Sequence, residues 1–226
     1  MSLLLKSDLR LAKFHLAPSC RLYLPLHELD GSSIMSRDAY GKLFIVKGAT
    51  WRPNGRLFAG TDDDISTASD DWLPLGNSPR TIAIWFQTST IGATISYLLS
   101  YGFWGTNSNY FGLHRNADKI AIAGYNETYN GTYRISINTW YLLFVSMTTT
   151  SIATFFYSPY AFIILDVNSA HTLNTLTGGK TTIGAKSLPA ISNNLDGIVD
   201  RVAVWAKAIT EPERQNWWEE TRWRYQ

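Results

Sequence analysis

The chain reads NLDGIVDRVAVWAKAIT from residue 194 to residue 210, and this stretch decides the fold. Asp196-Gly197 is typical of a turn, and the side chains from Ile198 to Trp205 then form two alternating sets. Alternation with a period of two predicts a β-strand. We therefore expect a strand from Ile198 to Trp205, followed by a helix that starts at Thr210.

The residues after this strand predict one C-terminal helix, from 211 to about 224. Thr210 and Glu213 have the spacing of a capping box, and Pro212 lies in the first turn, where its missing N–H is not needed. This helix contains Trp217, Trp218 and Trp223. We expect the tryptophans to dock on the sheet of their own domain; the alternative is that they anchor a partner.

Upstream of residue 194, the chain from Arg21 reads as short apolar runs separated by Gly, Pro, Asn and Asp, the residues that turns select. Many strands at near-regular spacing with no helix between them predict an antiparallel β-sandwich. The expected strands are 21–26, 43–46, 56–59, 80–88, 95–103, 110–114, 119–124, 132–137, 140–148, 151–157, 160–166 and 180–184.

Five fragments occur in an order that is typical of one family. They are RLYLPL at 21–26, ATW to DDDIS at 49–66, TIAIWF at 81–86, INTWY at 137–141 and the closing strand at 197–205. Together they resemble the laminin-G-like members of the concanavalin-A-like lectin and glucanase jelly rolls, over about residues 20–212. The resemblance implies an all-β fold, a concanavalin-A-like antiparallel sandwich. It also implies a family that mostly binds surfaces and sugars, and it names no reaction.

The domain organisation expected from the sequence is an N-terminal arm at 1–19 and one jelly-roll domain with its C-terminal helix at 20–226. A sandwich of this length is commonly a single domain, and no Pro/Gly/Ser-rich linker interrupts the chain. The arm matches nothing in the family pattern. It packs either on its own domain or on a neighbouring subunit, and we leave both alternatives open.

Composition argues against several classes of protein. The net charge is only +2, without a basic cluster, so we expect no nucleic-acid partner. Cys20 is the only cysteine, so there is no disulfide within the chain and no cysteine metal cluster. No apolar run is long enough for membrane insertion, and the apolar start is too short for a secretory signal. We therefore expect a protein that is not secreted.

Catalysis is not expected. Laminarinase-type hydrolases share the fold that the resemblance implies, and they carry a Glu-x-Asp-x-(x)-Glu motif. This motif places three carboxylates on one sheet face. Here Glu28-Leu29-Asp30 begins the motif, but Gly31-Ser32 follows and no second Glu completes it. We expect no cofactor either, except that the consecutive acids Asp62, Asp63 and Asp64 are weak candidates for a Ca²⁺ site.

Two segments combine aromatic and amide side chains, which suit the apolar face and the hydroxyls of a sugar. They span 101–110 and 125–133, and alternate loops of a meander fall on the same edge of a sheet, so we expect them to lie side by side. The candidate ligand-binding residues are Trp104, Asn107, Tyr110, Tyr125, Asn126 and Tyr129. The alternative is that these aromatic residues cap the core.

Residues 140–145 and 155–165 are apolar at consecutive positions, which indicates strands that are covered on both faces. The outer cover is a loop, the C-terminal helix or another subunit, and we prefer the subunit. The hypothesis is therefore a non-catalytic structural or attachment protein on the surface of a virus or phage particle, as a decoration protein or an adhesin, with glycan binding.

The expected partners are other structural subunits or a homo-oligomer, together with a cell-surface glycan. The expected location is the virion, assembled in the host cytoplasm; the alternative is the cell surface or the exterior by a non-classical route. The alternative function is a carbohydrate-binding module of a microbial protein, and a glycoside hydrolase ranks third.

Overall fold

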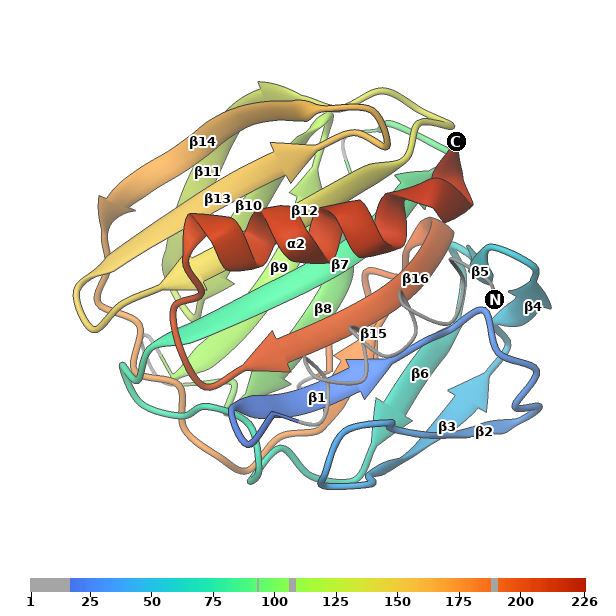
Figure 1. The fold of residues 1–226 in the computed structure, drawn as a ribbon. Coiled ribbons are helices and arrows are strands. Elements are labelled where there is room, and N and C mark those ends of the chain that lie inside the picture. Colours follow the sequence, from blue (N-terminus) through green and yellow to red (C-terminus); the bar gives the residue numbers. More distant parts are fainter. Residues whose placement is uncertain (1–16, 93, 106–108, 188–190) are drawn as a thin grey trace.

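The structure is a computed structural model that describes residues 17–92, 94–105, 109–187 and 191–226. These residues form two antiparallel sheets packed face to face, with one helix on the outside (Figure 1). The expected all-β sandwich with a short C-terminal helix is confirmed. Residues 1–16 of the expected arm lie outside the described residues, so both alternatives for the arm stay predictions.

Each sheet contains eight strands. The first sheet has, in spatial order, β14 (Phe162–Ala170), β13 (Ser151–Tyr157), β12 (Tyr141–Met147), β7 (Arg80–Thr88), β16 (Asp196–Trp205), β5 (Gly55–Ala59) and β4 (Thr50–Arg52), and β1 (Cys20–Leu24) also pairs with β16. The second sheet has β11 (Glu127–Arg134), β10 (Lys119–Gly124), β9 (Tyr110–Asn116), β8 (Ser96–Gly102), β15 (Thr181–Ile183), β6 (Asp64–Thr67), β3 (Leu43–Lys47) and β2 (Ser33–Met35).

The closing strand β16 has the predicted alternation from Val202 to Trp205, but Val199 lies in the core together with Val202 and Val204, so the single alternation expected from Ile198 to Trp205 is wrong. Val202 and Val204 face the core between the sheets, whereas Ala203 and Trp205 face the outside of the first sheet. A bulge interrupts the pairing of β16 with β7 next to Arg201, whose φ is +40°. An extra residue in one strand turns the following side chains to the other face, which keeps the later valines in the core.

The second apolar layer lies under α2 (Glu211–Thr221) and the 3₁₀ turn η1 (Arg222–Tyr225), which run across the outer face of the first sheet (Figure 1). The predicted capping box is present: the Glu213 carboxylate accepts a hydrogen bond from the Thr210 N–H at 2.8 Å. Trp217 and Trp218 are buried against the sheet, as expected. The outer face of β7, β12 and β16 is therefore covered by the helix. It is not covered by another subunit, which was the cover that we preferred.

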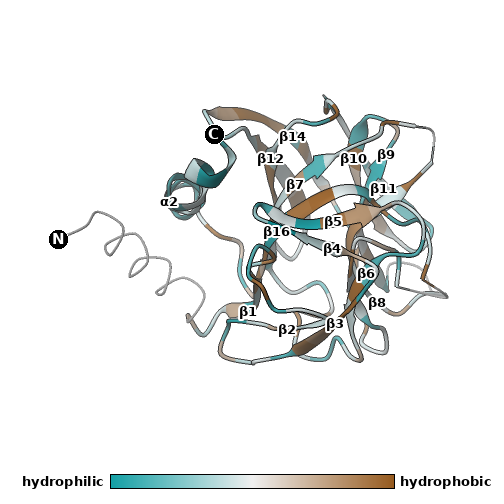
Figure 2. Cartoon of the chain, turned by 90° about the vertical axis from the view of Figure 1, so that its right-hand side faces the viewer, coloured by the Kyte–Doolittle hydropathy of each residue, from teal (hydrophilic) through white to brown (hydrophobic). Residues whose placement is uncertain are grey.

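The outer face of β14 lies beyond this cover. Tyr160, Phe162 and Leu165 are exposed by 69%, 50% and 41%, so a row of apolar side chains remains in contact with solvent. The ribbon of β14 is accordingly brown in Figure 2. Among the described residues, no helix has the length and apolar character needed to cross a membrane.

Two expectations about secondary structure are wrong. The short strands β2, β4 and β6 were not expected, and the segment 125–133 is not a loop, because β11 starts at Glu127. A two-residue turn at Tyr125-Asn126 joins β10 to β11, and Asn126 has a φ of +60°. Asn tolerates this left-handed backbone better than most residues, so the turn closes without a Gly.

Candidate functional site

An aromatic cluster lies where the β8–β9 loop meets the β10–β11 turn. The ring centroid of Trp104 is 5.0 Å from that of Tyr110 and 5.0 Å from that of Tyr125, and both pairs are T-shaped. The Lys186 Nζ atom lies 4.0 Å from the centroid of the Trp104 ring. These four residues, called the Trp104 cluster below, come from three separate parts of the chain. The two segments expected to lie side by side therefore touch.

The strand order of the second sheet brings these residues together. Gly102 at the end of β8 pairs with Tyr110 at the start of β9, and β10 runs back beside β9. Gly112 is necessary in this arrangement, because a Cβ atom there would lie 2.5 Å from Cε1 of Tyr97 and 2.9 Å from Cε1 of Tyr110. The absent side chain lets the tyrosine rings lie over the strand.

A buried aspartate fixes the neighbouring loop. Asp70 accepts hydrogen bonds from the Gly102 N–H at 2.8 Å, the Thr177 hydroxyl at 2.9 Å and the Gly178 N–H at 3.1 Å. The carboxylate thereby joins the end of β8, where the loop that carries Trp104 begins, to residues 177–178. A rigid support of this kind reduces the entropy that a loop loses when it binds a ligand.

The members of the cluster have different roles. Trp104, Tyr125 and Lys186 are half-buried and can reach a ligand, whereas Tyr110 is fully buried and supports the Trp104 ring. Burial raises the pKa of Tyr110, so its hydroxyl stays neutral, and burial lowers the pKa of Lys186. An ammonium group over an indole ring contributes about 0.5–2 kcal/mol and holds the charge beside the ring.

The other candidate residues have different surroundings. Asn126 is exposed in the turn beside Tyr125, and Asn107 lies outside the described residues. Tyr129 is on β11 and packs against the core between the sheets. Its hydroxyl also accepts a hydrogen bond from the Thr172 N–H at 3.0 Å. Tyr129 thus has the position that the alternative describes, with its ring against the core, and it is not part of the Trp104 cluster.

The three consecutive aspartates do not converge. Asp63 accepts a hydrogen bond from the Ala59 N–H at 2.7 Å, Asp62 pairs with Lys47 at 3.7 Å, and Asp64 is buried on β6. In the described ranges no three His, Cys, Asp or Glu side chains are grouped so as to hold a metal ion. The calcium prediction for Asp62, Asp63 and Asp64 therefore has no support from the structure.

A second polar network joins the C-terminus to the first sheet. Asp200 is fully buried, and one carboxylate oxygen is 2.7 Å from Nδ1 of His27 while the other accepts a hydrogen bond from the Tyr225 hydroxyl at 2.7 Å. A His–Asp pair of this kind occurs in catalytic triads. Here the carboxylate ties β16 to η1 and to the segment after β1, which is a structural task.

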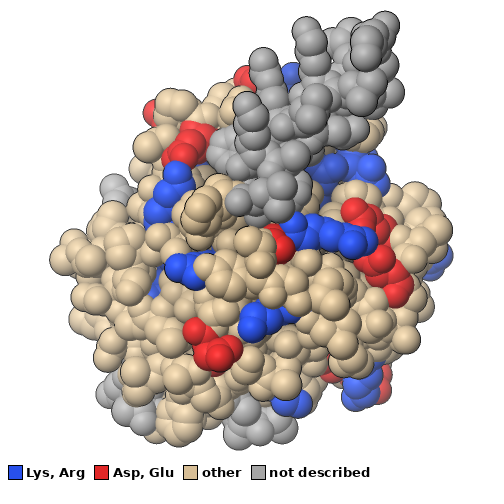
Figure 3. Space-filling model, turned by 60° about the horizontal axis from the view of Figure 1, so that its bottom comes forward, with Lys and Arg blue, Asp and Glu red and all other residues tan. Residues whose placement is uncertain are grey.

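The charged side chains form no single-sign field on the face shown in Figure 3, where Lys and Arg alternate with Asp and Glu. The pairs include Arg37 with Glu28 at 2.6 Å and Lys47 with Asp62 at 3.7 Å. Exposed pairs of this kind contribute little stability, and the mixture of signs does not suit a polyanion such as nucleic acid.

Comparisons with known proteins agree with this architecture. A family model described as concanavalin A-like lectin/glucanases superfamily matches residues 59–213. A search of curated protein sequences found no match. The structural search found Trypanosoma rangeli sialidase in complex with sialic acid, with a TM-score of 0.62 and 16% identity, covering 97% of this chain and 39% of that chain.

The structural search also found the binding domain of botulinum neurotoxin DC. Its complex with SialylT has a TM-score of 0.63 and 12% identity, covering 89% of this chain and 51% of that chain. Its complex with rat synaptotagmin II has a TM-score of 0.66 and 11% identity, with 89% and 51% covered. The chain thus spans about two fifths to one half of these solved chains, and at such identities the likeness shows the fold alone.

Proposed function

Since the chain belongs to the concanavalin A-like lectin/glucanase superfamily, we propose that it is a non-catalytic attachment domain that binds glycans at the Trp104 cluster. The observation that carries the proposal is the contact of Trp104 with Tyr125 and Lys186, which unites three segments at one edge of a rigid sandwich. Binding residues commonly occupy loops on such a scaffold.

The chemistry of the cluster suits a sugar. An aromatic ring offers an apolar surface to the C–H side of a pyranose, and Lys186 and Asn126 supply polar groups beside it. Two of the structural neighbours, the sialidase and the neurotoxin binding domain, are complexes with sialic acid and with SialylT. These names support a glycan as the class of ligand without identifying it.

The absence of catalysis is part of the proposal. The sequence lacks the second Glu that would complete a glucanase motif after Glu28-Leu29-Asp30. The buried Asp200 carboxylate is bonded to Tyr225 and His27 and is not available to protonate a glycosidic oxygen. Most retaining and inverting glycosidases use two carboxyl groups that flank the scissile bond, whereas sialidases use a tyrosine nucleophile.

A glycan array tests the proposal. The wild-type chain is expected to bind a subset of glycans, and Trp104→Ala and Tyr125→Ala are each expected to weaken binding at least about tenfold, because each removes an aromatic contact. Trp223→Ala is the matched control, since Trp223 is 51% exposed and lies on the opposite layer. A blank array, or equal binding by all variants, contradicts the proposal. Cleavage of a bound glycan would contradict the non-catalytic part.

A place on a virus or phage particle is the finer part of the proposal. Its support is the exposed apolar row of Tyr160, Phe162 and Leu165, because such a row is typical of protein contact surfaces. Light scattering and co-sedimentation with purified particles test this part. A Phe162→Ser/Leu165→Ser double variant is expected to lose the association and keep glycan binding. A wild-type monomer that binds no particle contradicts it.

A further inference from the structure

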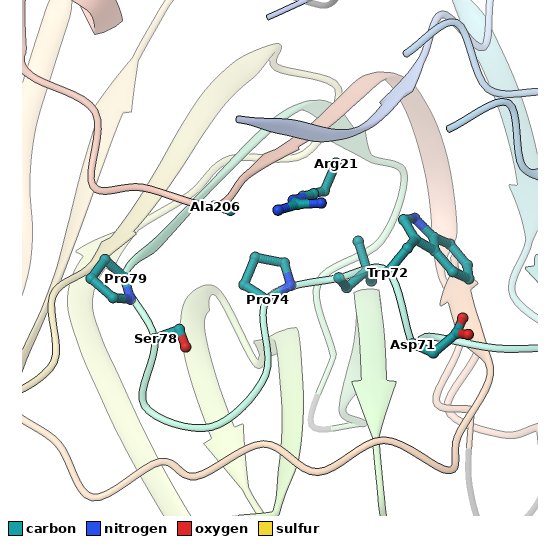
Figure 4. A pocket seen from close by; sticks show the side chains of 8 residues that line it. Arg21, Asp71, Trp72, Pro74, Ser78, Pro79 and Ala206 are labelled. Atoms are coloured by element: carbon teal, nitrogen blue, oxygen red, sulfur yellow. The ribbon is translucent and has the colours of Figure 1, made fainter. Parts of the chain in front are cut away.

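A pocket that shares no residue with the Trp104 cluster lies beside the start of β1. Its volume is about 380 Å³, within the usual range for small-molecule sites. Arg21 extends from β1 across the pocket above Pro74, with Trp72 and Asp71 on one side and Pro79 and Ser78 on the other (Figure 4). The sequence alone did not predict this pocket.

The walls of the pocket are held from inside the protein. Arg80 is fully buried and donates hydrogen bonds to the carbonyl oxygens of Ser78 at 3.1 Å and Gly76 at 2.6 Å. The Tyr101 hydroxyl, which accepts a hydrogen bond from Arg80, donates in turn to the carbonyl oxygen of Pro74. The pocket is therefore formed before a ligand arrives, which favours affinity.

Arg21 is the cationic side chain that lines this pocket. Its guanidinium lies 4.9 Å from the ring centroid of Tyr40 and donates a hydrogen bond to the Tyr40 hydroxyl. Within the described part of the chain Arg21 forms no ion pair. A guanidinium has five N–H donors in a planar fork that matches a carboxylate. Donors thus remain for an acidic group inside the pocket.

The other polar groups narrow the chemical class of the ligand. Asp71 carries a carboxylate at the edge of the pocket, which disfavours a multiply charged anion and requires a ligand that donates hydrogen bonds. Ser78 offers a hydroxyl, and the exposed Pro79 offers apolar surface. A ring that has one carboxylate, several hydroxyls and an apolar face meets all of these requirements.

We propose that the pocket binds one acidic sugar residue, a pyranose with a single carboxylate. Arg21 pairs with the carboxylate, Asp71 and Ser78 bond to ring hydroxyls, and the C–H face of the ring rests on Pro79. The proposal rests on the proposed glycan-binding function for its class of ligand, but it uses a separate set of residues. The chain would then hold an acidic glycan at two points.

Calorimetric titration with three probes tests the pocket: methyl β-glucuronide, methyl β-glucoside and acetate. The glucuronide is expected to bind at least about tenfold more tightly than either of the others, because a charge-assisted bond to Arg21 and the ring contacts are both needed. Arg21→Gln is expected to lose this preference, and Arg21→Lys to retain part of it. Equal binding of glucuronide and glucoside, or unchanged binding by Arg21→Gln, overturns the proposal.

Two further measurements separate this site from the Trp104 cluster. Trp104→Ala is expected to weaken binding on the glycan array but to keep the preference for the glucuronide over the glucoside; if it abolishes this preference while Arg21→Gln does not, the pocket proposal fails and the proposed function stands. In the wild-type chain, the glucuronide is expected to shift the NMR resonance of the Trp72 indole N–H, assigned with Trp72→Phe. This readout does not depend on whether an Arg21 variant folds, and an unmoved resonance overturns the proposal.

Discussion

His114 illustrates how one buried residue links stability to pH. It lies on β9 with 2% of its surface exposed, and its ring centroid is 5.1 Å from that of Tyr97. Burial lowers the pKa of His114 from 6.5 to about 4. The folded protein therefore holds this ring neutral between these two values, where the unfolded chain would protonate it.

The first prediction concerns this histidine. As the pH falls from 6.5 to about 4, His114 becomes protonated in the unfolded chain but stays neutral in the folded chain. The wild-type protein is therefore expected to lose about 3 kcal/mol of unfolding free energy at this site. His114→Gln is expected to lack this loss. Urea unfolding at several pH values measures both proteins, and parallel curves for the two would contradict the prediction.

The second prediction concerns Asp200. Burial alone would raise its pKa, but the hydrogen bond and charge of His27 and the charge of Arg201 outweigh burial, so the pKa lies below the ordinary 3.8. A carboxyl group whose pKa is lowered in the folded state stabilises the fold at pH values above its ordinary pKa. This stabilisation is lost as the pH falls through the pKa of the folded state. At neutral pH, Asp200→Asn is expected to lose about 3 kcal/mol, because it breaks a buried charged network.

The acid dependence distinguishes this charge effect from a simple packing defect. The difference in unfolding free energy between wild type and Asp200→Asn is expected to shrink as the pH falls below 3.8, where the carboxylate of the unfolded chain takes up a proton, and to go on shrinking until the folded carboxylate is protonated at lower pH. Tyr225→Phe keeps the ring and removes one donor to Asp200, and it serves as the milder control. A difference that stays constant down to acid unfolding would argue for packing alone.

At the residue scale, the sequence predicted part of the site. Trp104 and Tyr125 were recognised because aromatic residues in turn-rich segments of a meander fall at one edge. Lys186 was missed, because its contact with Trp104 joins parts of the chain that are 82 positions apart and depends on the pairing of β15 with β8. Arg21 was missed for the same reason, since its pocket forms only when β1 lies beside residues 71–79.

At the scale of elements, α2 supplies the third prediction. The Trp217 ring is fully buried, with its centroid 5.1 Å from that of Trp205 and 5.7 Å from that of Tyr23. Trp217→Ala is expected to lower the unfolding free energy by about 3–5 kcal/mol, the usual effect of deleting a buried tryptophan. Trp223→Ala, on the same C-terminal segment but 51% exposed, is expected to change it by less than about 0.5 kcal/mol.

Chemical denaturation followed by circular dichroism measures both tryptophan variants. Equal losses for Trp217→Ala and Trp223→Ala would mean that α2 contributes through its helix alone and not through its contacts with the sheet.

Elements with long regular patterns could be predicted, whereas short ones could not. β7, β10 and β13 have the bounds that their apolar runs indicate. β2 and β4 contain three residues each, too few to show an alternation, and they form because neighbouring strands offer hydrogen bonds. The β10–β11 turn lacks the Asn-Gly or Asp-Gly pair that is typical of a hairpin. The first part of β11 could therefore not be predicted as a strand.

At the scale of the whole molecule, β16 makes the two apolar layers interdependent. Val202 and Val204 belong to the core between the sheets, while Ala203 and Trp205 belong to the layer under α2. Residues of β16 also pair with β1, β5 and β7, which come from distant parts of the chain. Loss of either layer would expose one face of the same central strand.

The fourth prediction follows from this shared strand. Urea unfolding curves from tryptophan fluorescence, to which Trp85, Trp205, Trp217 and Trp218 of the layer under α2 contribute, are expected to coincide with those from far-ultraviolet circular dichroism. Coincidence indicates one cooperative transition. A fluorescence midpoint at clearly lower urea would mean that the helical layer detaches before the sandwich unfolds.

The placement of the helix and of the Trp104 cluster on opposite sheets has a practical consequence for biosensor work. Gln226 follows η1 on the helical side, where its side chain donates a hydrogen bond to the carbonyl oxygen of Pro159. Biotin attached there would tether the protein with its aromatic edge turned toward the flowing analyte. Coupling through random amines would instead modify Lys186, and the sensor would then underestimate glycan binding at the Trp104 cluster.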